Sequence, residues 1–351
     1  MDYLKIFEIA NKRYASDIII SVGVPPIIRI NGELISLDDF PVLDSEMTYN
    51  IIMEFLSEKQ KQRLKEELEL DFSTYRHGLG RYRVNAYTQR NSLSAAFRTI
   101  HEDPPDLKTV GLPEIAKKLA MLPHGLVLFA GATGCGKSTS LGAMIDFINS
   151  EKNTHIVTLE DPIEFIHKHK KSIIDQRQIE TDSLSFGKAL KSALRQDADV
   201  LMIGEIRDYT TVSSALMIAE TGHLVLSTIH TNDAAHTIDR IINMFPPDQH
   251  SQARMQLTSV LQGIISQHLI PRKDGKGRIA AREILVATHA VSNLIKEGKS
   301  SHLYSVIQTG GRDGMQTLDN SLIELARNNL ISSSNALLIA KNKEQVKQAL
   351  R

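Results

Sequence analysis

The sequence lacks several features that define common classes of protein. Its single cysteine, Cys135, excludes an internal disulfide and a cysteine-based zinc site, which fits a reducing compartment. It has no tryptophan, and its 10 phenylalanines and 8 tyrosines are too few for a protein built on base-stacking platforms. The 41 basic residues equal the 41 acidic residues, and this zero net charge argues against nucleic acid or an anionic membrane as the partner.

No targeting or membrane-spanning segment is evident. Asp2, Lys5 and Glu8 occupy the N-terminus, where a secretory signal would need an apolar region. No apolar run approaches the roughly 18 residues of a membrane span. We therefore expect a cytoplasmic protein without direct membrane insertion. Its 351 residues suggest two domains, at about 150 residues per domain.

The first 100 residues combine sheet and helix patterns. Alternating apolar residues flank Asn31-Gly32, a pair suited to a two-residue hairpin turn. Between residues 44 and 68 apolar residues recur at helical spacing, with Ser45 as the expected N-cap. From Gly80 to Ile100 the alternation returns and places Arg83 on the polar face. We predict a small α+β domain over residues 1–100.

A linker and a second domain are expected to follow. Residues 101–112 include two adjacent prolines and no apolar period, which is typical of an interdomain linker. Residues 113–351 alternate short apolar strands with helical patterns, which predicts a parallel α/β sheet. Two helices are expected over residues 318–350. The predicted strands are residues 126–130, 156–159, 200–203 and 224–227.

One segment of the second domain predicts phosphate binding. Residues 131–138 satisfy the pattern G-x-x-x-x-G-K-S, between an apolar strand and an amphipathic helix. Glycines allow backbone N–H groups to surround a phosphate, Lys137 would contact the β and γ oxygens of ATP, and the Ser138 hydroxyl would bind Mg²⁺. A glycine-rich turn without a ligand is the alternative, and the strand and helix context favours the nucleotide. The expected nucleotide-binding residues are Gly131, Ala132, Thr133, Gly134, Cys135, Gly136, Lys137, Ser138 and Thr139.

Acidic residues and a histidine follow three of the predicted strands. Glu160, Asp161 and Glu164 come after the second strand, and Glu205 ends the third. The carboxyl ends of parallel strands face the nucleotide in such sheets, so these carboxylates are candidates for magnesium binding and catalysis. His230 follows the fourth strand, where it could contact a γ-phosphate. Solvated loops and an ordinary surface histidine are the alternatives, and the run His167–Lys171 is interpreted as a solvated face.

Five blocks occur in an order that resembles the type II/IV secretion ATPase superfamily. The similarity extends over essentially the whole chain and is greatest to pilus retraction ATPases. The blocks are G-A-T-G-C-G-K-S-T (131–139), T-L-E-D-P-I-E-F (158–165), A-L-R-Q-D-A-D-V (193–200), G-E-I-R-D (204–208) and E-T-G-H-L-V-L-S-T-I-H-T (220–231).

This resemblance implies a fold, an assembly and residue roles. Residues 1–100 would form a PAS-like domain and residues 113–351 a RecA-like ATPase domain, assembled as a homohexamer with ATP between subunits. The motor would drive type IV pilus retraction and twitching motility, at the inner-membrane platform protein of the pilus machine. The implied catalytic residues are Lys137, Glu164 as the residue that polarises water, Glu205 on the magnesium side, His230 beside the phosphate, and Arg83 and Arg98 from the N-terminal domain.

Other assignments stay open beside retraction. Where retraction ATPases carry A-I-R-N-L-I-R-E, residues 290–297 read A-V-S-N-L-I-K-E. An accessory retraction ATPase fits many of the same motifs. An assembly or type II secretion ATPase usually carries a tetracysteine zinc insert, which one cysteine cannot form. A nucleotide-gated adaptor with little turnover is a different class, and phosphate release would separate it from a motor.

Overall fold

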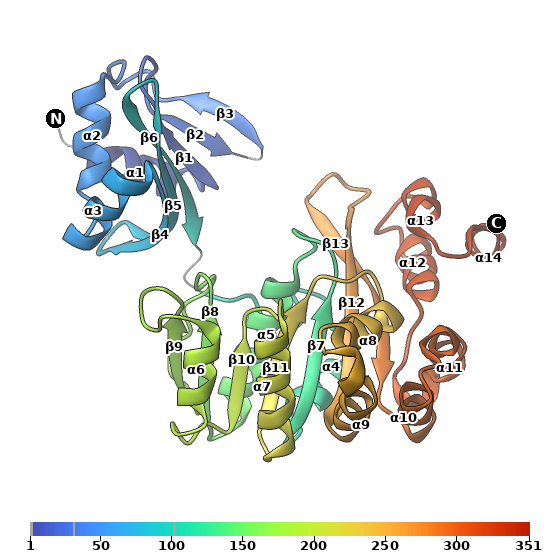
Figure 1. The fold of residues 1–351 in the computed structure, drawn as a ribbon. Helices are drawn as coiled ribbons and strands as arrows, with labels where there is room; N and C mark the ends of the chain where they lie inside the picture. The colour runs from blue at the N-terminus through green and yellow to red at the C-terminus, as the bar shows by residue number, and fades with distance from the viewer. Residues whose placement is uncertain (1–2, 31, 101–102) are drawn as a thin grey trace. The chain divides into compact units, whose positions relative to one another are not determined.

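The computed structural model describes residues 3–30, 32–100 and 103–351, which form two compact units (Figure 1). The first unit comprises Met1–Asp103 together with Glu164–Ile166, and the second comprises Pro104–Ile163 and His167–Arg351. Each unit has its own sheet and its own hydrophobic core. This agrees with the α/β class expected from the sequence. The expected linker falls partly on residues 101–102, which lie outside the described residues.

The first unit is an antiparallel sheet covered on one face by helices. Its strand order is β3-β2-β1-β6-β5-β4, and its helices α1 (Leu4–Lys12), α2 (Ser45–Met53) and α3 (Glu58–Glu67) close the core. Alternation explains the buried face, because Tyr82, Val84 and Ala86 are all fully buried. The strands are β1 (Asp17–Ile20), β2 (Ile27–Ile30), β3 (Glu33–Ser36), β4 (Glu69–Arg76), β5 (Gly80–Gln89) and β6 (Ser92–Ile100).

Two local predictions for this unit have different outcomes. The hairpin is confirmed, since Ile30 pairs with Glu33 across a two-residue turn, of which Asn31 lies outside the described residues. The N-cap is wrong: Asp44, not Ser45, caps α2, because its carboxylate accepts the Met47 N–H at 2.8 Å. The helical pattern also divides into α2 and α3, since a capping box at Ser57 starts a new helix.

The second unit is a mostly parallel sheet with helices on both faces. Its strand order is β13-β12-β7-β11-β10-β8-β9, and only the β12–β13 pair is antiparallel. Helices α6 to α9 cover one face, and α4 and α5 cover the other. The strands are β7 (Gly125–Ala130), β8 (His155–Glu160), β9 (Ile173–Gln178), β10 (Val200–Ile203), β11 (Leu224–Ile229), β12 (Leu261–Pro271) and β13 (Arg278–Val286).

The helices of this unit end in a C-terminal group of three, not the two expected. The second of the predicted helices divides in two, because the Asn342 side chain accepts the Gln345 N–H at 3.1 Å and starts a new helix. None of the helices in the described part of the chain has the length and apolarity needed to cross a membrane. The helices are α4 (Glu114–Ala120), α5 (Lys137–Glu151), α6 (Phe186–Ala193), α7 (Tyr209–Glu220), α8 (Ala234–Asn243), α9 (His250–Val260), α10 (His289–Lys296), α11 (Leu303–Thr309), α12 (Leu318–Arg327), α13 (Ser333–Ile339) and α14 (Lys343–Ala349).

The sheet order brings the predicted site segments to one edge. The strands β7, β11, β10 and β8 are consecutive neighbours and run parallel, so their carboxyl ends lie next to one another. These are the ends from which the phosphate loop, His230, Glu205 and the acidic segment depart. The fold therefore gathers segments that are up to about 100 residues apart in the sequence.

Candidate functional site

The phosphate loop connects β7 to α5 through three glycines with left-handed backbones. Gly131, Gly134 and Gly136 have φ angles of 146°, 75° and 87°. At Gly131 a Cβ would lie 2.6 Å from the Gln267 carbonyl oxygen, so only glycine fits there. The helix that follows has no side-chain cap at its start. Its first N–H groups are therefore available to an anion.

Lys137 folds back over the loop that precedes it. Its Nζ donates hydrogen bonds to the carbonyl oxygens of Gly131 and Ala132, both at 2.9 Å, and the residue is buried. Ser138 and Thr139 are half-buried in the first turn of α5. The Lys137 charge thus lies beside the loop glycines and the first N–H groups of α5, a combination typical of phosphate sites.

Cys135 is buried within the same loop. Burial raises the pKa of its thiol above the usual value, despite the nearby Lys137 ammonium. A raised pKa keeps the sulfur as an unreactive thiol at neutral pH. The structure thus favours a small packing residue over a redox-sensing cysteine.

Gln267 is a residue of this site that the sequence reasoning missed. It lies on β12 and is almost fully buried. Its Nε2 donates to the Cys135 carbonyl oxygen at 2.7 Å, and its Oε1 accepts from the Ser140 hydroxyl at 3.0 Å. It therefore ties the loop to the first turn of α5. The available signal was the polar stretch Ser266-Gln267-His268 between two apolar pairs, Ile264-Ile265 and Leu269-Ile270.

His230 lies between the phosphate loop and Glu205. Its Nδ1 is 3.5 Å from the Thr133 hydroxyl, and its Nε2 is 3.1 Å from Glu205 Oε2. Arg207 forms an ion pair with the other carboxylate oxygen of Glu205, and this hydrogen bond raises the pKa of the Arg207 guanidinium. Three of the predicted segments thus meet in one chain of polar contacts.

Hydroxyl groups on β11 hold the segment that carries Glu205. The Ser227 hydroxyl donates to the Ile203 carbonyl at 2.8 Å, and the Thr228 hydroxyl donates to the Gly204 carbonyl at 2.6 Å. The two accepting carbonyls belong to the two residues that come just before Glu205 in the chain. Buried hydrogen bonds of this kind restrict the backbone, and so they fix the direction in which the carboxylate points.

The acidic residues at the end of β8 and in the loop after it differ in burial. Glu160 is buried, and its Oε1 accepts from the Thr158 hydroxyl at 2.7 Å and from Gln176 Nε2 at 3.1 Å. Asp161 and Glu164 lie farther along the loop, and residues 164–166 are grouped with the first unit. Hydrogen bonds from neutral donors therefore stabilise the first of the three carboxylates.

Arg83 and Arg98 lie opposite each other on neighbouring strands of the first unit. They are register partners on β5 and β6, and both are exposed. Arg98 forms an ion pair with Asp17 at 3.0 Å, and Arg29 approaches the same carboxylate at 3.6 Å. The two predicted arginines are thus adjacent on the sheet face opposite the helices.

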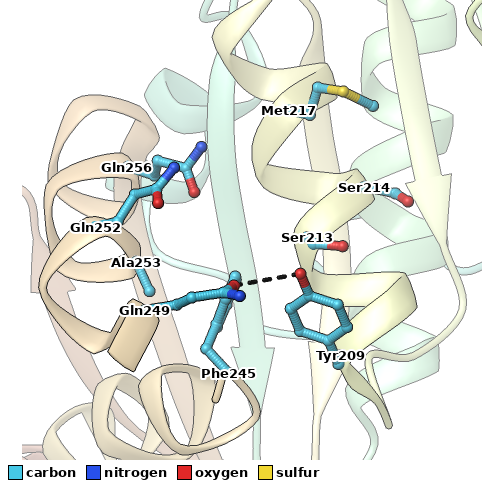
Figure 2. Close-up of a pocket in the computed structure, with 9 residues that line it drawn as sticks. All are labelled: Tyr209, Ser213, Ser214, Met217, Phe245, Gln249, Gln252, Ala253 and Gln256. Atoms are coloured by element: carbon cyan, nitrogen blue, oxygen red, sulfur yellow. Dashed lines mark hydrogen bonds between the residues drawn. The ribbon is translucent and has the colours of Figure 1, made fainter. Parts of the chain in front are cut away.

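Two cavities of about 260 Å³ border the second unit's helices, and only one of them is charged. Figure 2 shows the first, between α7 and α9, where Tyr209 donates to Gln249 at 3.3 Å and the other lining groups are uncharged. The second cavity contains an acidic side chain and two guanidinium groups, and guanidinium groups are good ligands for phosphates. It is lined by Glu205, Ile206, Arg207, Ile229, His230 and Arg240.

The prediction that the run 167–171 is a solvated face is wrong for its first residue. His167 is buried, whereas residues 168–171 are exposed. Its backbone N–H donates to Gln176 Oε1 at 2.8 Å, and burial lowers the pKa of its imidazole to about 4. The first residue of this run is therefore part of the interior, because the loop crosses the second half of α5.

Comparison with known proteins agrees with this geometry. A family model described as "Type II/IV secretion system protein" matches residues 94–333. The type IV pilus retraction ATPase PilT of Pseudomonas aeruginosa is 45% identical over 96% of this chain and 97% of its own. The type IV pilus ATPase PilU of the same organism is 41% identical over 96% and 88%, respectively.

A solved structure gives the same result for the fold. The crystal structure of the pilus retraction motor PilT with bound ADP matches with a TM-score of 0.93 and 43% identity, covering 99% of both chains. Such agreement over both units confirms the expected RecA-like ATPase preceded by a smaller domain. The chain therefore belongs to the type II/IV secretion system protein family and is an ATP hydrolase of that family.

Proposed function

We propose that this protein is the motor that hydrolyses ATP to drive retraction of type IV pili, the movement that underlies twitching motility. The observation that carries the proposal is the similarity to PilT over nearly the whole chain, in both units. The contacts of His230 with Thr133 and Glu205 support the hydrolysis step, because they join the phosphate loop to an acidic group.

Within this proposal each site residue has a defined role. The loop residues Gly131 to Gly136 and the first turn of α5 hold the phosphates, with Lys137 on the β and γ oxygens. Glu164 polarises the attacking water. His230, whose ring lies next to the Thr133 hydroxyl, would contact the γ-phosphate. Its contact with Glu205 keeps the imidazole oriented between the nucleotide and the carboxylate.

The residues present fit a magnesium ion. Mg²⁺ keeps several waters and takes one or two carboxylates together with phosphate oxygens. Ser138 and Glu205 would hold it, and the Glu205 side chain is only 14% exposed. In residues 3–30, 32–100 and 103–351 no group of three or more acidic, histidine or cysteine side chains could hold a metal. Bound by Ser138 and Glu205, the ion would neutralise charge on the phosphates of ATP.

Arg83 and Arg98 are assigned to a nucleotide of a neighbouring subunit in a homohexamer. Both are exposed guanidinium groups on one face of the first unit, which suits recognition of an anion from outside the unit. Such an arginine can raise the rate of phosphoryl transfer about 10³-fold or more. Mixing Arg98→Ala with Lys137→Ala subunits would form some intact interfaces and should restore part of the ATPase activity.

The site of action in this proposal is the cytoplasmic side of the inner membrane, at the pilus base. The partner is the platform protein of the pilus machine, and neither nucleic acid nor membrane insertion is involved. Zero net charge supports this choice over a nucleic-acid partner.

An accessory retraction ATPase is the second candidate, and the 41% identity to PilU favours keeping it. Deleting the gene separates the two. Loss of pilus retraction, restored by the wild-type gene but not by Lys137→Ala, would support a principal motor. Retraction that persists at reduced force would support the accessory role. A purified protein that binds ATP and releases no phosphate would instead indicate a structural adaptor.

A further inference from the structure

A buried ionic cluster connects the C-terminal helices to the segment that follows His230. Lys341, between α13 and α14, places its Nζ 2.9 Å from Asp233 Oδ2 and 2.8 Å from Glu283 Oε2. The three side chains are 33%, 11% and 3% exposed, respectively. Two largely buried carboxylates thus share one ammonium, and neither is in the site described above.

Both carboxylates hold the first turn of α8. Asp233 Oδ1 accepts the His236 N–H at 2.9 Å, and Glu283 Oε1 accepts the Ala234 N–H at 3.0 Å. The helix begins four residues after His230. The position of its first turn therefore limits where the backbone of His230 can lie.

The backbone that carries the ammonium is fixed by a third carboxylate. The backbone N–H of Lys341 donates to Asp319 Oδ1 at 2.8 Å, and the backbone N–H of Asn342 donates to Asp319 Oδ2 at 2.9 Å. The Lys341 Nζ also lies 5.5 Å from the centre of the Tyr304 ring. Asp319 is fully buried. These contacts hold the turn between α13 and α14, so Lys341 is not a freely moving surface side chain.

The pKa shifts of Asp233 and Lys341 favour the charged forms of both groups, and so they favour the ion pair. Burial alone would raise the pKa of Asp233, but hydrogen bonds from the His236 N–H and from Lys341 bring it below its ordinary value. Burial would likewise lower the pKa of Lys341, and its bonds to Glu283 and Asp233 raise it instead. The His236 ring also contacts Asp233, at 2.7 Å. The ammonium and Asp233 are therefore both charged at neutral pH.

We propose that Lys341 is a positioning residue for the hydrolysis site: through Asp233 and Glu283 it fixes the start of α8 and thereby His230. The C-terminal segment 333–349 then belongs to the ATPase machinery, although it contributes no group to the nucleotide. This inference rests on the proposed ATPase function. It predicts that loss of the ammonium slows hydrolysis more than it weakens nucleotide binding.

The experiment compares Lys341→Met with three other variants. Lys341→Arg keeps a donor cation, and Lys343→Met removes an exposed lysine two residues away. Val346→Ala loosens the packing of the same C-terminal segment, since Val346 is fully buried, but leaves the ammonium in place. Melting temperature, affinity for fluorescent ADP, and kcat are measured for each.

Lys341→Met should lose about tenfold or more in kcat, as other orienting residues do, while ADP affinity stays within about twofold. Lys341→Arg and Lys343→Met should remain close to wild type. Val346→Ala should melt at a lower temperature and keep its kcat. An equal loss of kcat in Val346→Ala and Lys341→Met at matched stability would overturn the proposal, as would unchanged kcat in Lys341→Met. If Lys341→Met does not fold, Lys341→Gln replaces it with the same expectations.

Hydrogen exchange separates this inference from the proposed function. In Lys341→Met the amides of Ala234 and His236 should exchange at least about tenfold faster, because their acceptors lose a fixed position. If the wild type hydrolyses no ATP, the function fails but this exchange result still tests the connection. Unchanged exchange at both amides would overturn the inference even in an active enzyme.

Discussion

The starts of α5 and α8 differ in how their first N–H groups are satisfied. At α5 the preceding residue is Gly136, with no side-chain cap and no acidic residue in the first turn. At α8 two buried carboxylates, Asp233 and Glu283, accept those N–H groups. Both helices begin at the same edge of the sheet, after neighbouring parallel strands.

This difference shows what makes a helix start a binding site. Every helix leaves unpaired N–H groups at its beginning, and side-chain caps normally satisfy them. A capped start such as that of α8 stabilises the fold and leaves fewer donors for a ligand. An uncapped start that follows a glycine-rich loop leaves its donors to an external anion. The predictions below test this contrast.

The largest effect should follow Lys137→Ala, which removes the cation beside the uncapped start of α5. ATP turnover should fall at least about a thousandfold, since the charge on the β and γ oxygens loses its partner. Phosphate release measures this directly. Lys191→Ala, at an exposed position on α6, is the matched control and should keep its turnover. Substantial activity in Lys137→Ala would mean that the start of α5 is not the phosphate site.

Glu164→Gln should separate ATP binding, which is proposed for the start of α5, from ATP hydrolysis. The variant should bind ATP with wild-type affinity and hydrolyse it about 10² to 10⁴ times more slowly, because it loses only the group that polarises water. Equilibrium binding and single-turnover hydrolysis measure the two steps. Normal turnover here, with loss in Glu205→Gln, would show that the roles of the two carboxylates are reversed.

Acidification should lower the stability of the fold through His167, whose loop packs against the C-terminal half of α5. Burial lowers the pKa of this imidazole to about 4, so the unfolded chain takes up a proton first as the pH falls. The free energy of unfolding is therefore greatest above about pH 6.5 and falls as the pH drops toward 4, with a loss of about 2 kcal/mol at pH 5. Urea unfolding at pH 7 and pH 5 measures it. His167→Phe should remove this part of the pH dependence, and the exposed His124→Phe should leave it unchanged.

The smallest effect should follow removal of an ordinary cap. Asp44→Ala deprives the Met47 N–H at the start of α2 of its acceptor and should cost about 1 kcal/mol of unfolding free energy. Its ATPase activity should equal that of the wild type, as should that of the exposed control Asp38→Ala. If Asp44→Ala lost as much activity as Lys137→Ala, the contrast between a capped helix start and a ligand-binding helix start would be wrong.

Much of the architecture could be predicted because it is encoded locally. The strand Val200–Ile203 has the predicted bounds, and the buried face of Gly80–Gln89 follows its alternation. The apolar residues of the helix after the phosphate loop, such as Leu141 and Ile145, are fully buried as its spacing indicated. The phosphate loop was readable because glycines at fixed spacing serve a backbone geometry that few other residues allow.

The remaining features depend on contacts that are distant in sequence. Gln267 meets Cys135 across 132 residues, and Lys341 meets Asp233 across 108, so neither partner is visible in a local pattern. The strands β9, β12 and β13 were missed, because polar residues interrupt their apolar runs. The apolar residues of α10 also differ in burial, since Val291 and Ile295 lie in the core whereas Ala290 is exposed.

A protein of zero net charge can still carry a strongly uneven charge distribution. Asp17 is the only acidic member of a row that runs across four neighbouring strands of the first unit with Arg29, Arg98 and Arg83. The row therefore has a surplus of two positive charges, and any anion that binds Arg98 must compete with Asp17. Salt screens both attractions over a Debye length of about 8 Å at physiological ionic strength. Ionic strength thus acts directly on this face, although the chain as a whole is neutral.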